Sequence, residues 1–129
     1  MSYHINKIIE AKDIQTAKTN VTEALKSEGF GILTEIDIQA TMKNKLDKDY
    51  PPFLILGACN PQFADQILSI DPNMSALLPC NVTLRGKENG EIEVSAIDPV
   101  AAIASIGGNK IESLAKEVKE KLERALATL

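Results

Sequence analysis

Two cysteines and the residues around them are the strongest candidates for chemistry in this sequence. Cys59 stands in the run LGACNP (56–61) and Cys80 in LLPCNV (77–82), so an asparagine follows each thiol. A thiol near the start of a helix can have its pKa lowered, which raises the thiolate fraction at neutral pH. Cys59 and Cys80 are therefore candidate catalytic residues for thiol–disulfide or persulfide chemistry. The alternative is that both are small buried hydrophobic residues at strand ends.

A second candidate is a pair of carboxylates in a predicted strand. Glu35 and Asp37 alternate, with Thr34 beside them. Paired carboxylates can serve in acid–base catalysis if one is desolvated, and otherwise form a solvated strand face. The single histidine, His4, lies near the N-terminus and suggests no nucleophile–base pair, which counts against cysteine-dependent hydrolysis. Whether the protein is an enzyme stays open.

The sequence offers few metal ligands. A closed zinc site needs four Cys or His ligands, and only Cys59, Cys80 and His4 are present. Two cysteines from each of two subunits would make a four-thiolate site, and two thiolates alone would suit Cu(I). We predict no metal site and no cofactor.

The elements that must position these residues can be read from hydrophobic periodicity and from helix caps. Glu35 and Asp37 should share one face of their strand, with Ile32, Thr34 and Ile36 on the core face. Asn60 and Pro61 are typical of a helix start, where free N–H groups favour an anion. Strands are expected near 3–10, 31–38, 53–58, 77–84 and 91–97, and helices near 13–28, 40–46, 61–69 and 99–103.

A last helix should be capped by Asn109, with Glu112 in capping-box register. Pairs four residues apart, such as Glu112–Lys116 and Glu120–Arg124, should stabilise it. Asn89-Gly90 is a strong hairpin signal, so the sheet cannot be purely parallel. The order predicts an α+β fold. We expect a two-layer sandwich whose mixed or antiparallel sheet has about four to five strands, with helices on one face.

Composition limits the classes of function. The 129 residues make one expected domain (1–129), with 14 basic and 18 acidic residues and a net charge of −4. The acidic balance and the few aromatic residues argue against nucleic-acid binding. No apolar run reaches the roughly 20 residues that span a bilayer, and residues 1–10 lack the pattern of a signal peptide. We therefore expect a cytoplasmic protein with no membrane partner.

Four blocks of the sequence resemble the signature of a bacterial and archaeal family, domain of unknown function 302. The blocks are GFGILTEID (29–37), ILGACNP (55–61), LLPCNV (77–82) and DP (98–99), in the family's order. The resemblance covers nearly the whole chain and implies a small α/β protein that forms a homodimer, with no activity to carry over. It also draws together one set of polar and turn residues: Thr34, Glu35, Asp37, Cys59, Asn60, Pro61, Pro79, Cys80, Asn81 and Asp98.

Three functions follow as alternatives. The first is a homodimeric binding module that holds a small ligand or anion near Cys59–Pro61, with Thr34, Glu35, Asp37, Cys59, Asn60, Cys80 and Asn81 as ligand-binding residues. The second is a thiol-dependent redox or sulfur-transfer protein that uses Cys59 and Cys80. The third is a structural protein whose main property is self-association, because helices on one sheet face leave the other face uncovered.

Overall fold

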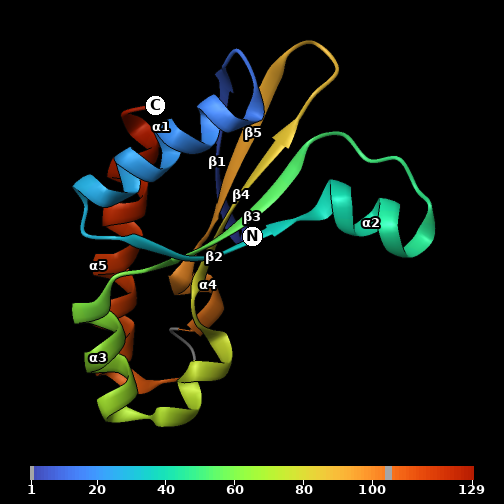
Figure 1. Ribbon diagram of the computed structural model, residues 1–129. Coiled ribbons are helices and arrows are strands. Elements are labelled where there is room, and N and C mark those ends of the chain that lie inside the picture. Colours follow the sequence, from blue (N-terminus) through green and yellow to red (C-terminus); the bar gives the residue numbers. More distant parts are fainter. Residues whose placement is uncertain (1, 104–105) are drawn as a thin grey trace.

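A five-stranded antiparallel sheet forms the centre of the protein (Figure 1). The computed structural model describes residues 2–103 and 106–129. The strands are ordered β1-β5-β4-β3-β2, and each neighbouring pair is antiparallel. The predicted α+β class is therefore confirmed. The strands are β1 (His4–Glu10), β2 (Gly31–Asp37), β3 (Phe53–Cys59), β4 (Cys80–Gly86) and β5 (Glu91–Ile97).

The helices fall into three groups around the sheet (Figure 1). Two long helices, α1 and α5, lie against one face, and α3, η1 and α4 gather beyond the strand ends beside the first half of α5. The short helix α2 stands apart from both groups, on the other side of the sheet. The helices are α1 (Ile14–Ser27), α2 (Ile38–Leu46), α3 (Pro61–Ile70), the 3₁₀ helix η1 (Pro72–Leu77), α4 (Pro99–Ile103) and α5 (Gly108–Ala127).

The core forms where alternate strand residues meet the apolar stripes of α1 and α5. Val82 and Leu84 of β4 point toward the helices and are fully buried. The helix predicted near 13–28 is confirmed as α1, and it is capped by Asp13, whose carboxylate accepts a hydrogen bond of 2.8 Å from the N–H of Thr16. The buried stripe residues are Ala17, Val21 and Leu25 of α1 and Val118, Leu122, Ala125 and Leu126 of α5.

The strand expected at 77–84 begins later than predicted. Residues Pro72–Leu77 instead form η1, because the Asp71 carboxylate accepts a 3.0 Å hydrogen bond from the N–H of Asn73 and Pro72 opens the helical turn. The turn also buries Met74, which belongs to the cluster around α3 and α5. The apolar leucines before Pro79 therefore do not extend β4.

The expected cap of the last helix is also wrong. Helix α5 begins at Gly108 with Gly107 as its N-cap, so Asn109 lies inside the first turn and makes no side-chain cap. The predicted pair between Glu112 and Lys116 is present at 3.5 Å. Arg124 instead binds Glu28 at the end of α1, at 3.0 Å, so its charge joins two helices.

Beyond its bulge, strand β2 presents to the helices the face that was predicted to point away from the core. Its pairing with β3 shifts between Ile32 and Thr34, which leaves Leu33 in a bulge. Ile32 still packs on the core, but Thr34 and Ile36 then point to the uncovered face of the sheet. Glu35 lies opposite the buried Leu56 and faces the helices. The bulge reverses the predicted orientation, because one extra residue moves each following side chain to the other face.

Within residues 2–103 and 106–129, we find no helix whose length and apolar content would let it cross a membrane.

Candidate functional site

The two thiols meet at one end of the sheet. Cys59 ends β3 and Cys80 opens β4, where Cys80 pairs with Ala58, the residue before Cys59. Both cysteines are free and half-buried, and both line the same cavity. The pairing of β3 with β4 therefore brings together two residues that lie far apart in the sequence.

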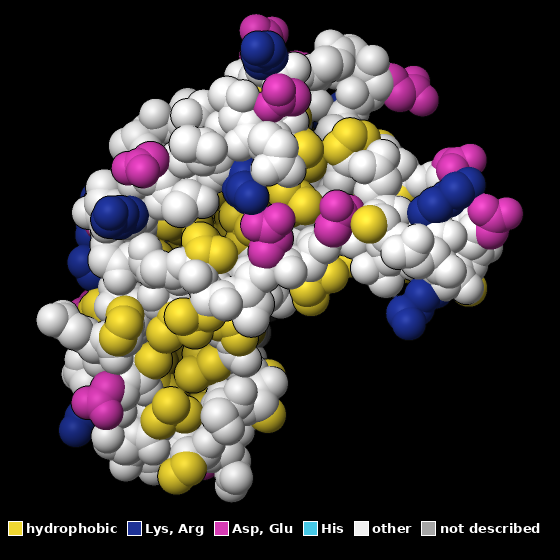
Figure 2. Space-filling model, in the orientation of Figure 1, with side chains coloured by type: hydrophobic (Ala, Val, Ile, Leu, Met, Phe, Trp, Pro, Cys, Tyr) yellow, Lys and Arg dark blue, Asp and Glu magenta, His cyan; other side chains and the backbone are white. Residues whose placement is uncertain are grey.

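This cavity, which we call the thiol pocket, has almost entirely apolar walls. It lies between the main core under the sheet and a second cluster formed by α3, η1, α4 and α5. Figure 2 shows hydrophobic side chains around a hollow in the lower part of the molecule, where Figure 1 places α3 and η1. Its volume is about 30 Å³, and its lining residues are Phe30, Ala58, Cys59, Asn60, Phe63, Ala64, Ile67, Leu78, Pro79, Cys80, Pro99, Ile103, Ala115 and Val118.

The pocket keeps one of its thiols neutral. Burial raises the pKa of Cys80 to about 11, and the nearby sulfur of Cys59 raises it further in the same direction. Burial acts this way because a low-dielectric surrounding disfavours the charged thiolate. At neutral pH the Cys80 side chain is therefore a small apolar group and a weak nucleophile.

Asn60 occupies the predicted start of α3 but does not cap it with its side chain. Its Nδ2 instead donates a hydrogen bond of 3.3 Å to the carbonyl oxygen of Glu28, at the end of α1. The close approach depends on Gly29, which has a φ of +90° and would place a Cβ 3.0 Å from Nδ2 of Asn60. Asn60 thus ties the start of α3 to the end of α1.

Gly57 of β3 allows β2 and the residue before β4 to approach closely beside the pocket. A Cβ at this position would lie 2.8 Å from Cγ of Pro79 and closer still to Oγ1 of Thr34. The hydroxyl of Thr34 and the ring of Pro79 therefore fill the space where a side chain would stand. Thr34 packs against the back of the strand that carries Cys59, without lining the thiol pocket.

The carboxylates of β2 are held away from the thiols. Glu35 forms an ion pair of 3.0 Å with Lys18 of α1. Asp37 caps α2, since its carboxylate accepts a hydrogen bond of 3.0 Å from the N–H of Ala40. Both side chains therefore have structural partners, and neither reaches Cys59 or Cys80 across the pocket.

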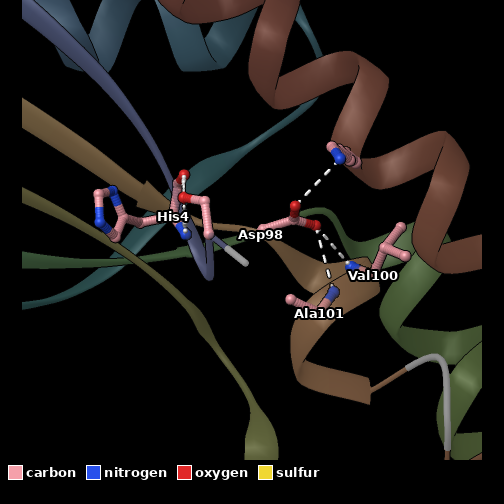
Figure 3. A network of polar contacts seen from close by, with 6 residues as sticks. His4, Asp98, Val100 and Ala101 are labelled. Atoms are coloured by element: carbon pink, nitrogen blue, oxygen red, sulfur yellow. Dashed lines mark hydrogen bonds and ion pairs between the residues drawn. The ribbon is translucent and has the colours of Figure 1, made fainter.

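Asp98 is a buried carboxylate at the end of β5 (Figure 3). It accepts hydrogen bonds from the N–H groups of Val100 and Ala101, at 2.9 and 3.3 Å, and pairs with Lys119 of α5 at 3.0 Å. Burial alone would raise the pKa of Asp98, but these hydrogen bonds outweigh burial and hold the pKa below its ordinary value. Asp98 thus fixes α4 and α5 against the sheet, while the His4 ring points away from it (Figure 3).

The uncovered face of the sheet carries a polar hollow that the sequence did not reveal. It measures about 440 Å³ and includes Asn81, the last of the predicted site residues. Its other lining residues are Tyr3, His4, Asn6, Phe53, Thr83, Arg85, Glu93, Ser95, Ala96 and Ile97. The signal that could have found it is the alternation of polar residues along both strands of the hairpin, but the misplaced start of β4 hid their register.

Comparison with known proteins places the chain in a family. The family model described as "Domain of unknown function DUF302" matches residues 5–129. The chain belongs to the DUF302 family. A solved structure with the same fold is that of a DUF302 protein from Bacillus stearothermophilus, described as an uncharacterized conserved protein. It is 23% identical, covers 98% of both chains and has a TM-score of 0.88. Among curated proteins, none matches the chain.

The polar and turn residues of the DUF302 resemblance therefore fall into separate places. Cys59, Asn60, Pro79 and Cys80 gather around the thiol pocket. Glu35, Asp37 and Asp98 hold helices in place, and Asn81 faces the polar hollow. In the part of this DUF302 protein that the structure describes, no three His, Cys, Asp or Glu side chains form a group that could hold a metal ion.

Proposed function

We propose that this DUF302 protein is a homodimeric binding module that holds a small uncharged ligand at the junction of β3 and α3, around Cys59–Pro61. The observation that carries the proposal is the thiol pocket, which opens at this junction and has almost no polar wall. An anion would lose its hydration there without gaining partners. The lining therefore favours an apolar ligand over an anion.

The size of the pocket defines what enters it. A cavity of about 30 Å³ has room for about two water-sized groups. The ligand would therefore insert a methyl, thiomethyl or similar apolar end, while the rest of the ligand stays outside the cavity. The pocket lies between two hydrophobic clusters and takes lining residues from both, such as Ala58 from one and Ile67 from the other.

The thiol chemistry supports binding more than redox catalysis. The meeting of Cys59 and Cys80 favours a redox protein as the second candidate. However, a thiol with a pKa of about 11 is both a weak nucleophile and a poor leaving group in thiol–disulfide exchange. A cytoplasmic location is part of this proposal, and it is supported by the two free cysteines at one site, because disulfides are rare in a reducing compartment.

The second copy in the proposed homodimer would cover β2 and α2. Leu33 of β2 is 66% exposed and Leu46 of α2 is 60% exposed. Helix α2 has nine residues and buries none, although isolated helices below about 12 residues are marginal in water. Helix α2 carries Lys43 and Lys45, and the segment that follows it adds Asp47, Lys48 and Asp49, so the charges in this region are mixed and two copies can meet without a large net repulsion.

The ligand proposal is tested by nuclear magnetic resonance with xenon and a series of primary alcohols as probes. We expect saturable shifts confined to the methyl groups of Ile67 and Val118, which line the pocket. Ala64→Leu should remove these shifts by filling the cavity. The matched control is Ala127→Leu, an exposed position on α5, which should keep them. Shifts that no probe saturates, or that persist in Ala64→Leu, would refute the proposal.

The dimer is tested by sedimentation at micromolar concentration. We expect a dimer that Leu33→Glu converts to a monomer, because a carboxylate would be buried in the interface. Leu77→Glu is the control, since Leu77 is an exposed leucine of η1, away from β2 and α2. A wild-type monomer, or equal loss of the dimer in both variants, contradicts this arrangement.

A further inference from the structure

We propose that the polar hollow on the uncovered face of the sheet is a second binding site, for a neutral polyhydroxylated molecule such as a monosaccharide. The hollow faces away from α1 and α5, on the side of the sheet opposite the main core, and shares no lining residue with the thiol pocket. The inference is therefore independent of the function proposed for that pocket. Its volume of about 440 Å³ falls within the range of about 300–1,000 Å³ that is typical of small-molecule sites.

A chain of hydrogen bonds fixes the polar side chains on one flank of the hollow. Glu93 accepts a hydrogen bond from Nη2 of Arg85 on one carboxylate oxygen and from Nδ2 of Asn6, at 3.1 Å, on the other. Because Nδ2 of Asn6 points to Glu93, its Oδ1 faces His4 and accepts from Nδ1. Nδ1 of His4 is therefore the donor in this contact, which holds the imidazole ring in a defined direction.

The central rows of the hollow keep unused hydrogen-bonding capacity. Thr83 and Ser95 are cross-strand partners on β4 and β5, and Asn81 lies one row away on the same face. Among residues 2–103 and 106–129, their side chains have no hydrogen-bond partner. Arg85 is 43% exposed and uses one of its five N–H donors on Glu93. The free groups thus include donors, acceptors and hydroxyls that do both.

The charges of the hollow exclude a strongly ionic ligand. Hydrogen bonding from Arg85, and the positive charges of Arg85 and Lys87, lower the pKa of Glu93, which is therefore ionised at neutral pH. Arg85 and Glu93 then neutralise each other in an ion pair, so neither offers an unpaired charge to an anion or a cation. A ligand whose own groups both donate and accept fits this set best, and vicinal hydroxyls have that property.

Aromatic rings complete the match to a sugar. Tyr3 stands edge-on to the His4 ring, with 4.6 Å between ring centroids, and Phe53 lines the opposite side. Such rings provide an apolar surface for the C–H face of a pyranose, while the polar side chains between them reach its hydroxyls. Polar groups alone would serve many solutes, but polar groups between two rings favour a ligand with one apolar face.

The test is a titration of the uniformly ¹⁵N-labelled protein with D-glucose, D-galactose, myo-inositol and D-glucuronate. We expect saturable amide shifts at residues 81–85 and 93–95, with dissociation constants in the millimolar range. Ser95→Ala should weaken binding about fivefold to tenfold, because one hydrogen bond is lost. Ser113→Ala, an exposed serine on α5, is the matched control and should bind as the wild type does.

Three results would overturn the proposal. The first is the absence of a saturable shift with each of the neutral probes. The second is tighter binding of D-glucuronate than of D-glucose, which would show that the hollow recognises anions. The third is a set of shifts that follows protein concentration rather than probe concentration, which would show that a second copy of the chain occupies this face.

Discussion

The thiol pocket and the polar hollow both take residues from β3 and β4, yet they differ in almost every property that matters for chemistry. The pocket contains the residue type that is most reactive in isolation, yet burial leaves Cys80 a neutral thiol. The hollow is built from ordinary strand residues such as Thr83, Arg85 and Glu93, yet it retains charge and free hydrogen-bonding groups. Burial on one face and exposure on the other therefore decide the chemistry more than residue type does.

The largest expected effect is a difference in the stability that is lost when a residue is substituted on one face of the sheet or on the other. Leu84→Ala on the helix-covered face should lower the free energy of unfolding by about 2–5 kcal/mol, because Leu84 is fully buried. Thr83→Ala, one residue earlier on the open face, should cost no more than about 1 kcal/mol. Urea unfolding of both variants measures the difference. Similar losses would show that the open face is also covered in solution.

A smaller effect compares a buried carboxylate with one in the hollow. Asp98→Ala should cost about 1–2 kcal/mol at neutral pH, because it removes the cap of α4 and leaves Lys119 without its partner. Glu93→Gln should cost less, since Glu93 lies on a wetter surface. Urea midpoints at neutral pH rank the two variants. An equal or larger loss for Glu93→Gln would mean that the hollow is part of the protein's stabilising framework.

The pH dependence of Asp98 follows from the sign of its shift. Folding lowers the pKa of Asp98. The contribution of its carboxylate to the free energy of unfolding is therefore fully present above the unfolded pKa of about 3.9, and it is lost as pH falls through the folded pKa. The stability gap between the wild type and Asp98→Ala should therefore narrow in acid. A gap that stays constant below about pH 3 would show that the carboxylate charge contributes nothing.

The smallest effect concerns the thiols and appears in alkaline solution. Because folding raises the pKa of Cys80 to about 11, the unfolded chain loses this proton first. The contribution of the neutral Cys80 thiol to the free energy of unfolding is fully present below the unfolded pKa of about 8.5, and it is lost as pH rises toward 11. The wild type should lose stability in this window relative to Cys80→Ala, as measured by urea unfolding.

The reactivity of the Cys80 thiol can also be measured directly, by alkylation followed by mass spectrometry. Cys80 should react slowly at pH 8, where about one molecule in a thousand carries the thiolate. Unfolding in urea should remove this protection. Fast reaction of folded Cys80 at neutral pH would move the redox alternative ahead of the binding module.

Local patterns in the sequence predicted most elements but not the contacts between them. The stripe of α1 and its Asp13 cap depend on neighbours within one or two turns, so they could be read directly. The bulge at Leu33 depends on pairing with β3, and it reversed the predicted face of Glu35. The meeting of Cys59 and Cys80 depends in the same way on the register between Ala58 and Cys80.

The polar hollow was missed for a related reason. Asn6, which contacts His4, reaches Glu93 only because β1 lies beside β5, which is more than 80 residues away in the sequence. No short-range spacing encodes that neighbour. Asn60 shows a milder form of the problem, because its position at the start of α3 was predicted but its hydrogen bond goes to Glu28 in another helix.

The strand order also determines when β1 can pair with its neighbour while the protein is made on the ribosome. Strand β1 is made before the other four, yet its single neighbour in the sheet is β5, which is made after them. Until residue 97 has left the exit tunnel, the apolar side chains of Ile5 and Ile9 lack the partners that they have in the native sheet. A nascent chain with such an unpaired strand is prone to association, and a pairing this distant in sequence slows folding.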